Sequence, residues 1–309
     1  MKSDAKILVA GSQTLLGAAI ARELRARGHQ NLVAADGDCL RDAAQCEALF
    51  AREKPDSVFV AAGRSGGIGL NVAQPADLIL DNLALITNVL PAAQRHGAQK
   101  TLYLASSCCY PRLASQPLGV AALGTGPLEP TNEAYATAKI AGLVLCRALR
   151  KQHGASFIAA IPANDFGPGD DFGPDGHVIA ALLRRMHDAK ENGASQVAIW
   201  GSGSPQREFV FADDVASACL FLMDNYDDVL PINIGSGETL SIRELAFLVR
   251  EVVGYAGELV FDASKPDGMP LKSLDSSPLR ALRWQARFPL REALRRTYEW
   301  FLSRKDAND

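Results

Sequence analysis

Short apolar runs alternate with amphipathic, helix-length segments along the first half of the chain. Strands that alternate with helices form a parallel sheet covered on both faces, because each parallel connection needs a crossover. The pattern predicts an α/β fold, a Rossmann-type doubly wound parallel sheet. Strands are expected at residues 6–10, 31–35, 57–61, 100–106 and 156–161, with helices at 16–27, 43–53, 75–95 and 135–152.

The amino-acid composition of the chain changes beyond Pro162. Residues 164–174 are rich in Gly, Pro and Asp, which predicts a long functional loop. Helices are then expected at 177–190, 241–253 and 290–302, with short strands at 197–200, 232–234 and 259–261. We interpret this part as a smaller C-terminal α/β substrate domain. The expected division is a first domain of residues 1–163 plus about 207–226, and a substrate domain of 164–206 and 227–309.

Composition narrows the classes of partner. The 309 residues are 48% apolar, enough for a substantial core, and carry a net charge of −3 with no basic stripe. Nucleic acid is therefore not expected as a partner. The six cysteines form no C-x-x-C pair and no metal-ligand spacing, which with the lack of a signal peptide predicts reduced thiols, a cytoplasmic location and no metal site. No apolar run approaches the ~18–20 residues of a membrane span, so no membrane is expected.

A glycine-containing turn joins the first strand to the first helix. Gly11 and Gly17 bracket a G-x-x-G-x-x-G-like segment in which Thr14 takes the middle position and Gln13 precedes it. At this place a dinucleotide pyrophosphate meets backbone N–H groups and the helix dipole. The alternative is a plain strand-to-helix turn. A β-branched residue is strained at positive φ, so Thr14 is expected to have an ordinary helical φ.

Asp36 directly follows the second predicted strand, about 20 residues after the glycines. A carboxylate at this place binds the adenosine ribose hydroxyls of NAD and repels the extra phosphate of NADP. The alternative interpretation is a turn-forming Asp in the segment Asp36-Gly-Asp38, and both remain open.

Two further segments indicate one catalytic site. The segment Ser106-Ser-Cys-Cys-Tyr-Pro111 follows the fourth strand, and Tyr135 and Lys139 share one face of the next helix. A nearby ammonium lowers the pKa of a tyrosine, so Tyr135 can donate a proton to a carbonyl oxygen as hydride reaches carbon. A hydroxyl from Ser106 adds a second donor to the oxyanion. The nearby Cys108 suggests that the carbonyl compound is also deprotonated at the neighbouring carbons.

With these segments in place, the chain resembles the GDP-L-fucose synthase family of extended short-chain dehydrogenases, over nearly its whole length. The segments that carry the resemblance are Ala61-Ala-Gly-Arg-Ser-Gly-Gly67, Ser106–Pro111, Leu128-Glu-Pro-Thr-Asn-Glu-Ala-Tyr135, Lys139, Pro162-Ala-Asn-Asp-Phe-Gly-Pro168, Gly176-His-Val-Ile179, Trp200-Gly-Ser-Gly203, Arg207-Glu-Phe209, Asp213-Asp214 and Lys265-Pro-Asp-Gly268.

The resemblance implies that the chain epimerises GDP-4-keto-6-deoxy-D-mannose at C3 and C5 and then reduces C4 to give GDP-L-fucose. It implies that Ser106, Tyr135 and Lys139 form the reductase triad and that Cys108 and His177 are the epimerisation acid and base. Thiol and imidazole groups can both exchange protons near neutral pH. The resemblance also implies Asn164 as a cofactor-binding residue, together with Gly11, Gln13, Thr14, Gly17, Asp36, Tyr135 and Lys139. It implies a substrate site of Arg185, Trp200, Arg207, Asp267 and Lys272.

Several positions depart from the family pattern, chiefly in the nucleotide loop. Thr14 replaces a glycine, Gln13 replaces an arginine, and the segment at Asp36 lacks the arginine that meets the 2′-phosphate of NADPH. The resemblance thus implies NADP(H), whereas the local residues favour NAD(H). The expected partner is a GDP-linked 4-keto-6-deoxy sugar, and the resemblance implies a homodimer through the helix that carries Tyr135 and the helix before it. Alternatives are a paralogue acting on another nucleotide sugar, of colitose or heptose type, and a non-catalytic dinucleotide sensor.

Overall fold

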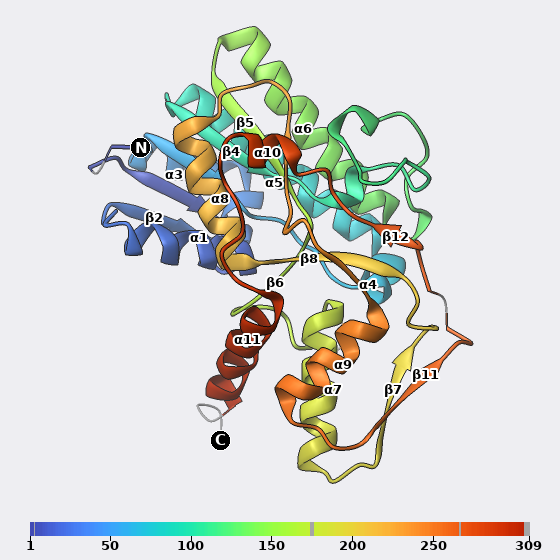
Figure 1. The fold of residues 1–309 in the computed structure, drawn as a ribbon. Helices are drawn as coiled ribbons and strands as arrows, with labels where there is room; N and C mark the ends of the chain where they lie inside the picture. Colours follow the sequence, from blue (N-terminus) through green and yellow to red (C-terminus); the bar gives the residue numbers. More distant parts are fainter. Residues whose placement is uncertain (3, 174–175, 266, 306–309) are drawn as a thin grey trace.

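The computed structural model describes residues 1–2, 4–173, 176–265 and 267–305. Its large sheet has six parallel strands in the order β2-β1-β3-β4-β5-β9, the Rossmann-type arrangement that the alternation predicts (Figure 1). These strands are β1 (Ile7–Ala10), β2 (Leu32–Ala35), β3 (Ser57–Val60), β4 (Lys100–Leu104), β5 (Ser156–Pro162) and β9 (Ile232–Ile234).

Helices cover both faces of this sheet. Helix α1 (Leu15–Ala26) packs beside α8 (Ala212–Asn225) on one face, while α3 (Ala43–Glu53), α5 (Pro75–Arg95) and α6 (Glu133–His153) lie on the other (Figure 1). The bounds of α3 and α5 match the expected ones, and α1 and α6 differ from theirs by one or two residues. Short helices that the sequence analysis did not predict are α2 (Gly37–Arg41), α4 (Ile68–Ala73) and α10 (Ser277–Ala281).

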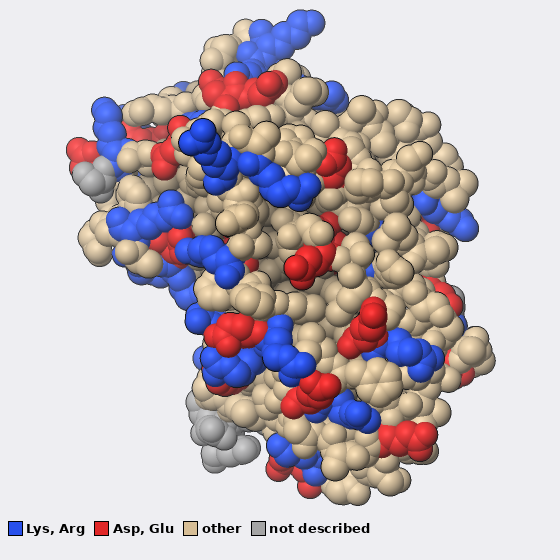
Figure 2. All heavy atoms as spheres, viewed as in Figure 1, with Lys and Arg blue, Asp and Glu red and all other residues tan. Residues whose placement is uncertain are grey.

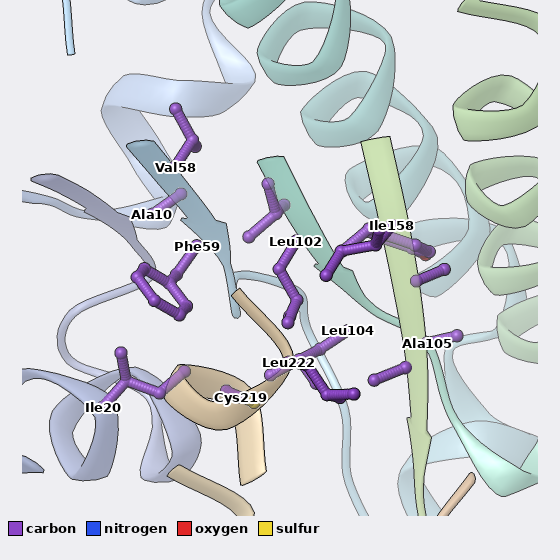
Figure 3. Packing of buried hydrophobic residues seen from close by; sticks show 14 of the residues in the cluster. Ala10, Ile20, Val58, Phe59, Leu102, Leu104, Ala105, Ile158, Cys219 and Leu222 are labelled. Carbon is purple, nitrogen blue, oxygen red and sulfur yellow. The ribbon is translucent and has the colours of Figure 1, made fainter. Parts of the chain in front are cut away.

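The central strands bury apolar side chains on both faces, which is why they appear in the sequence as continuous apolar runs. Figure 3 shows Phe59 of β3 and Leu104 of β4 on the face where Ile20 of α1 and Leu222 of α8 also lie. All of these side chains are at most 2% exposed. Each such burial contributes about 1.5–3 kcal/mol, so this packing fixes the strand order and, with it, the places where the strands end.

The C-terminal part of the chain has its own apolar cluster. The parallel pair β7 (Gln196–Trp200) and β11 (Glu258–Asp262) lies beside α7 (Val178–Glu191) and α9 (Ile242–Val253), and α11 (Leu290–Lys305) packs on α9 (Figure 1). The cluster is rich in aromatic residues, including Phe166, Phe209, Phe211, Tyr298 and Phe301.

Strand β8 (Gln206–Phe211) runs between the two clusters and pairs with three short strands, β6 (Asn164–Phe166), β10 (Thr239–Ser241) and β12 (Leu271–Lys272). Residues 164–166 are therefore a strand, where the sequence analysis expected the start of a long loop. The loop's last residue, Pro174, lies outside the described residues. The sequence did not indicate this strand, because Phe166 is its one apolar residue and the segment is otherwise rich in Gly and Asp. The strand forms because it pairs with β8, not because its residues have a high β propensity.

The two apolar clusters support a division into two domains, which we propose rather than take as established. Strand β9 belongs to the large sheet through its parallel pairing with β5. This differs from its expected place in the substrate domain, and we therefore propose that the segment through Ile234 belongs with the first domain. Helix α8, which packs on α1, belongs there as well.

Helix α5 alone among the described helices is long and apolar enough, by length and composition, to cross a membrane. The sequence analysis expected no segment of this kind. Its inner face, which includes Leu85, Val89 and Leu90, lies in the main core, and a buried core helix passes the same test. Figure 2 shows Lys and Arg interspersed with Asp and Glu on the face drawn there, with no continuous basic stripe.

Glu208 of β8 ties the C-terminal segments to the centre of the molecule. Its side chain is fully buried and accepts hydrogen bonds from the N–H groups of Gly237 at 2.8 Å and Leu274 at 2.7 Å. We expect Glu208→Ala to lower the free energy of unfolding by about 2–4 kcal/mol, because two buried donors lose their acceptor. The exposed neighbour Glu238→Ala should change it by less than about 0.5 kcal/mol. Urea unfolding checks both, and equal midpoints for the two variants would contradict the expectation.

Candidate active site

The turn between β1 and α1 is shaped by two glycines. Gly11 has a φ of +83°, and a Cβ atom there would lie 2.5 Å from the Cα of Ala62. Gly17 likewise has no room for a side chain, because a Cβ would meet the carbonyl of Gly11. The close backbone approach and the helix N-terminus behind it fit a dinucleotide pyrophosphate, which binds to such N–H groups.

Thr14 replaces the middle glycine by acting as the N-cap of α1. Its φ of −71° is negative as expected, but its ψ of 160° is extended rather than helical, as is usual for an N-cap. The hydroxyl donates to the carbonyl of Gly11 at 2.8 Å and accepts from the N–H of Gly17 at 3.1 Å. The side chain thus closes the turn, while Gln13 is exposed.

Asp36 is the exposed N-cap of α2, and its Oδ1 accepts from the N–H of Cys39 at 2.9 Å. This is the turn-forming interpretation of the residue. The arrangement also leaves the carboxylate at the end of β2, where a ribose would lie. Asn164, expected at the cofactor, donates from Nδ2 to the carbonyl of Glu208 at 2.8 Å, so its side chain is held by β8.

Ser106, Tyr135 and Lys139 come together beyond the end of β4. Ser106 is the N-cap of the 3-10 turn η1 (Ser107–Cys109), and its hydroxyl hydrogen-bonds with the Tyr135 side chain. The Nζ of Lys139 lies 5.8 Å from the centre of the Tyr135 ring and donates to the carbonyl of Leu104 at 3.2 Å. The helical spacing of Tyr135 and Lys139 therefore places both in one site.

The protonation of this pair differs from the sequence-based expectation. Burial raises the pKa of Tyr135 well above its usual value, and the charge of Cys108 adds to the rise, while the hydrogen bond with Ser106 opposes it. Burial also lowers the pKa of Lys139 to about 8. The expected lowering of the Tyr135 pKa was wrong because desolvation of the phenolate outweighs the ammonium. Tyr135 is thus held as a phenol that can donate a proton.

Gly63, which follows β3, makes room for the lysine. A Cβ on Gly63 would lie 3.0 Å from the Nζ of Lys139 and 2.6 Å from the Oδ1 of Asn82. The fully buried Asn82 donates to the carbonyls of Arg64 and Leu78 at 2.9 and 2.8 Å. Asn82 therefore fixes the segment against which the ammonium lies.

Cys108 lies two residues beyond Ser106, within the turn η1, and its backbone N–H donates to the Ser106 hydroxyl at 3.3 Å. Its half-buried Sγ accepts from the Nδ2 of Asn132 at 3.2 Å and from the Nζ of Lys272 at 3.6 Å. The three residues line one small pocket, together with Ser107, Tyr110, Leu118, Glu129 and Met269. The neighbouring Cys109 is fully buried, and burial raises its pKa to about 12.

His177 is the exposed N-cap residue of α7, with no hydrogen bond from its side chain to the helix end. It acts electrostatically on Asp165 of β6, a carboxyl group whose pKa is raised by burial and lowered by His177 and Lys139. The charges of His177 and Lys139 thus both act on this carboxyl group.

Of the residues expected to bind substrate, Trp200, Arg207 and Lys272 lie on β7, β8 and β12, Asp267 lies between β11 and β12, and Arg185 lies on α7. Lys272 pairs in register with Arg207, so both side chains leave the same face of this small sheet. Arg207 donates to the carbonyl of Met269 at 2.6 Å, and Asp267 accepts from the N–H and the hydroxyl of Ser202, each at 2.7 Å. The structure therefore brings Lys272 to Cys108 and leaves Arg207 one strand away.

Arg185 and Trp200 lie on α7 and β7, in the C-terminal part of the chain. Arg185 of α7 donates to the carbonyl of Ala198 at 3.1 Å. Trp200, at the end of β7, is 66% exposed, with the Nζ of Lys265 5.6 Å from its ring centre. An indole this exposed offers a flat apolar surface. Among the described residues no group of three or more His, Cys, Asp or Glu side chains could hold a metal.

Sequence reasoning missed Asn132, Gly63 and Asp165. Each lies within a segment that carried the family resemblance, but residue type alone gave no reason to choose it. Only the folded chain shows what they meet: Asn132 contacts the sulfur of Cys108, and Gly63 lies beside the Nζ of Lys139.

A protonated phenol above a buried lysine, beside a turn shaped for a pyrophosphate, is typical of a pyridine-nucleotide-dependent carbonyl reductase or epimerase. The chain belongs to the NAD dependent epimerase/dehydratase family, whose sequence pattern matches residues 7–235.

Similar proteins agree with this assignment over nearly the full length. The chain is 51% identical over 303 residues to GDP-L-fucose synthase 1 of Arabidopsis thaliana, covering 97% of this chain and 94% of the relative. Its structure matches a GDP-L-fucose synthetase of Naegleria fowleri bound to NADP, with a TM-score of 0.91 and 29% identity, covering 99% of this chain and 96% of the other. It also matches a GDP-6-OMe-4-keto-L-xylo-heptose reductase of C. jejuni (TM-score 0.93, 31% identity, 98% and 99% coverage).

The space beside Gly63 gives a test of the lysine's placement. We expect Gly63→Ala to slow hydride transfer at least about tenfold, because a new Cβ displaces the Lys139 ammonium and Asn82. Gly97→Ala is the matched control, since Gly97 also has a positive φ but no atom within 4 Å of its Cβ position. Single-turnover nicotinamide absorbance measures the rates. An equal loss in both variants would show that backbone strain, not the lysine, is responsible.

Proposed function

We propose that this chain is a sugar-nucleotide 3,5-epimerase and 4-ketoreductase that converts GDP-4-keto-6-deoxy-D-mannose to GDP-L-fucose. The observation that carries the proposal is that Cys108 lies within the same turn as Ser106, whose hydroxyl bonds Tyr135. A group that can move a carbon-bound proton is thus adjacent to groups that bind the carbonyl oxygen. The 51% identity to a GDP-L-fucose synthase supports the choice of substrate.

Reduction at C4 uses the triad. When bound, the reduced nicotinamide supplies the hydride. Tyr135 donates its phenolic proton to the C4 oxygen, and its raised pKa keeps that proton available until the oxygen becomes basic. Ser106 donates a second hydrogen bond to the same oxygen. Lys139, with a pKa of about 8, remains largely protonated at neutral pH and stabilises the phenolate that results.

Epimerisation precedes reduction, because the C4 ketone acidifies the protons on C3 and C5. Removal of one of these protons gives an enolate, and the Ser106 and Tyr135 hydroxyls stabilise its oxygen. Cys108 and His177 act as the acid/base pair that removes each proton and returns one to the opposite face. The same oxyanion site thus serves both chemical steps.

The GDP moiety is assigned to the outer part of the site. Arg207 and Arg185 offer forked cations suited to a diphosphate, and Lys272 offers a point charge next to Cys108. Trp200 offers an exposed ring for stacking, and Asp267, held by Ser202, orders the adjacent segment. These roles are proposals supported by residue chemistry and by the resemblance.

A second candidate is a reductase or epimerase for another GDP-linked 4-keto sugar. The structural match to a C. jejuni heptose reductase favours this alternative. Assays with GDP-4-keto-6-deoxymannose beside GDP-heptose and UDP- or dTDP-linked 4-keto sugars separate the two. A non-catalytic sensor is disfavoured because the assembled Ser106–Tyr135–Lys139 site has no use in binding alone.

Cys108→Ser tests the epimerase half. We expect incorporation of solvent deuterium at C3 and C5 to fall by at least about a hundredfold, because a hydroxyl is a far weaker base than a thiolate. Cys39→Ser, at the other half-buried cysteine, is the control and should exchange normally. Mass spectrometry of the recovered sugar nucleotide measures exchange. Unchanged exchange in Cys108→Ser would remove this residue from the mechanism.

For the cofactor we propose NADP(H), which the N. fowleri relative binds and which the resemblance implies. The preference for NAD(H) expected from Asp36 gains no support from the similar proteins. In the structure Asp36 serves as the N-cap of α2, which accounts for a carboxylate at this position without NAD(H).

Asp36→Asn tests how this carboxylate acts on the cofactor. We expect the Kd for NADPH to fall by about three- to tenfold, because a negative charge near the 2′-phosphate is removed while the cap is kept. The Kd for NADH should stay the same or rise. Asp42→Asn, the same change at the N-cap of α3, is the control. Fluorescence titration measures both constants, and equal effects of the two variants on NADPH would contradict a local role.

We also propose a homodimer through α5 and α6. The helices pack against each other, and each exposes an apolar side chain, Leu80 at 64% and Val144 at 47%. A cytoplasmic location remains a proposal, supported by six cysteines that are all free.

A further inference from the structure

We propose that Asn132 is a positioning residue for epimerisation, which acts by holding the sulfur of Cys108 as a hydrogen-bond acceptor. Lys272 is its partner in this role. The inference rests on the proposed function, because it concerns how the acid/base cysteine is prepared. It adds a residue to which neither the sequence nor the family resemblance gave a role.

The position of Asn132 makes its contact with Cys108 unusual. Asn132 is the N-cap residue of α6, and asparagine at an N-cap normally accepts a hydrogen bond from the first turn of the helix. Here the side chain makes no such bond. Its Nδ2 instead donates to the Sγ of Cys108 at 3.2 Å. Helix α6 thus lacks a side-chain cap that would stabilise it by about 1 kcal/mol, and the amide hydrogen-bonds to the cysteine instead.

The carbonyl oxygen of the same amide is also in an unusual environment. The Oδ1 of Asn132 is buried and has no hydrogen-bond partner in the structure. An unpaired buried carbonyl oxygen costs free energy, so the amide would turn to satisfy it if nothing else held the group. The contact between Nδ2 and sulfur therefore fixes an orientation that the helix end and the carbonyl oxygen do not favour.

The two groups that hydrogen-bond to the Cys108 sulfur are both donors that cannot accept a hydrogen bond. The NH₂ group of an asparagine and the ammonium of Lys272, 3.6 Å from Sγ, have no lone pair to offer a thiol proton. Two donors that converge on one sulfur stabilise a negative charge there. Lys272 also lies in register with Arg207, so the cation that contacts the sulfur belongs to the strand pair assigned to the diphosphate.

The arrangement separates the two chemical steps. The contact of Asn132 is with Cys108, whereas Ser106, Tyr135 and Lys139 are held by β4 and by each other. A change at Asn132 should therefore impair proton exchange at C3 and C5 more than hydride transfer at C4. Hydride transfer is measured alone in the reverse direction, by oxidising GDP-L-fucose with NADP⁺ in a single turnover.

Asn132→Asp is the decisive variant because it separates capping from donation. Aspartate has the shape of asparagine and is as good an N-cap, but it has no NH₂ group. We expect deuterium exchange to fall by about ten- to a hundredfold and reverse hydride transfer by less than about threefold. Aspartate also places a negative charge beside the sulfur, which by itself disfavours a thiolate. Asn132→Leu has a similar size but neither the NH₂ group nor a charge, so its exchange should fall as well if the lost donor is responsible; normal exchange in Asn132→Leu would assign the loss in Asn132→Asp to the added charge.

Asn132→Gln keeps the donor on a longer side chain and should retain more exchange than Asn132→Asp. If Asn132→Asp folds poorly, Asn132→Leu takes its place in this comparison. The inference is overturned if Asn132→Asp exchanges within twofold of the unmodified chain, if Gln is no better than Asp, or if hydride transfer falls as much as exchange.

A substrate-free measurement distinguishes this inference from the proposed function. In a Cys39→Ser background, Cys108 is the one cysteine that is not buried, so iodoacetamide reports on it. We expect alkylation at neutral pH to slow by about tenfold in Asn132→Asp, because the sulfur loses a hydrogen-bond donor and faces a carboxylate instead. If the unmodified chain lacks activity on the GDP sugar but alkylation responds in this way, the proposed function fails and the role of Asn132 stands. Unchanged alkylation contradicts that role whatever the substrate.

Discussion

The parallel pairing of β1, β3, β4 and β5 places the carboxyl ends of these strands at one edge of the sheet, and the site depends on this constraint. Gly11 follows β1, Gly63 follows β3, Ser106 follows β4 and Asn164 begins just beyond β5. None of these residues is near another in the sequence. The apolar packing that fixes strand order therefore also fixes which loops meet (Figure 3).

At that edge, burial sets the protonation of Tyr135 and Lys139, the groups proposed to be catalytic. Lys139 lies against Gly63 and under Tyr103, whose ring centre is 5.5 Å from its Nζ. Burial disfavours both the ammonium and the phenolate, so it lowers the pKa of Lys139 and raises that of Tyr135. A phenol that keeps its proton until the substrate oxygen becomes negative is a general acid suited to reduction. The reverse reaction needs the phenolate, and the nearby ammonium then stabilises it.

The sequence predicted the order of the five strands and the four long helices in the first 163 residues, because period and length are local properties, but it missed the short helices α2 and α4. It also predicted that Tyr135 and Lys139 share a site, since helical spacing alone places them on one face. It did not predict β6, because pairing with β8 arises from residues some forty positions away. It gave Asp36 two interpretations, and the structure shows the capping one without removing the other. The roles of the substrate-binding residues remain predictions for a similar reason, because side-chain placement on β7 and β12 does not by itself identify the ligand.

The position of Lys272 suggests how substrate binding and proton transfer are coupled. Its ammonium contacts the sulfur of Cys108, yet its strand is paired with the strand of Arg207. A diphosphate that binds Arg207 would draw the same ammonium toward a second anion, and the sulfur would then depend more on the neutral donor of Asn132. A neutral donor keeps its direction whether or not the diphosphate is present, whereas a lysine can move between two anions. If the proposed roles hold, one residue of each kind on the cysteine would let the site bind a charged substrate without losing the orientation that proton transfer requires.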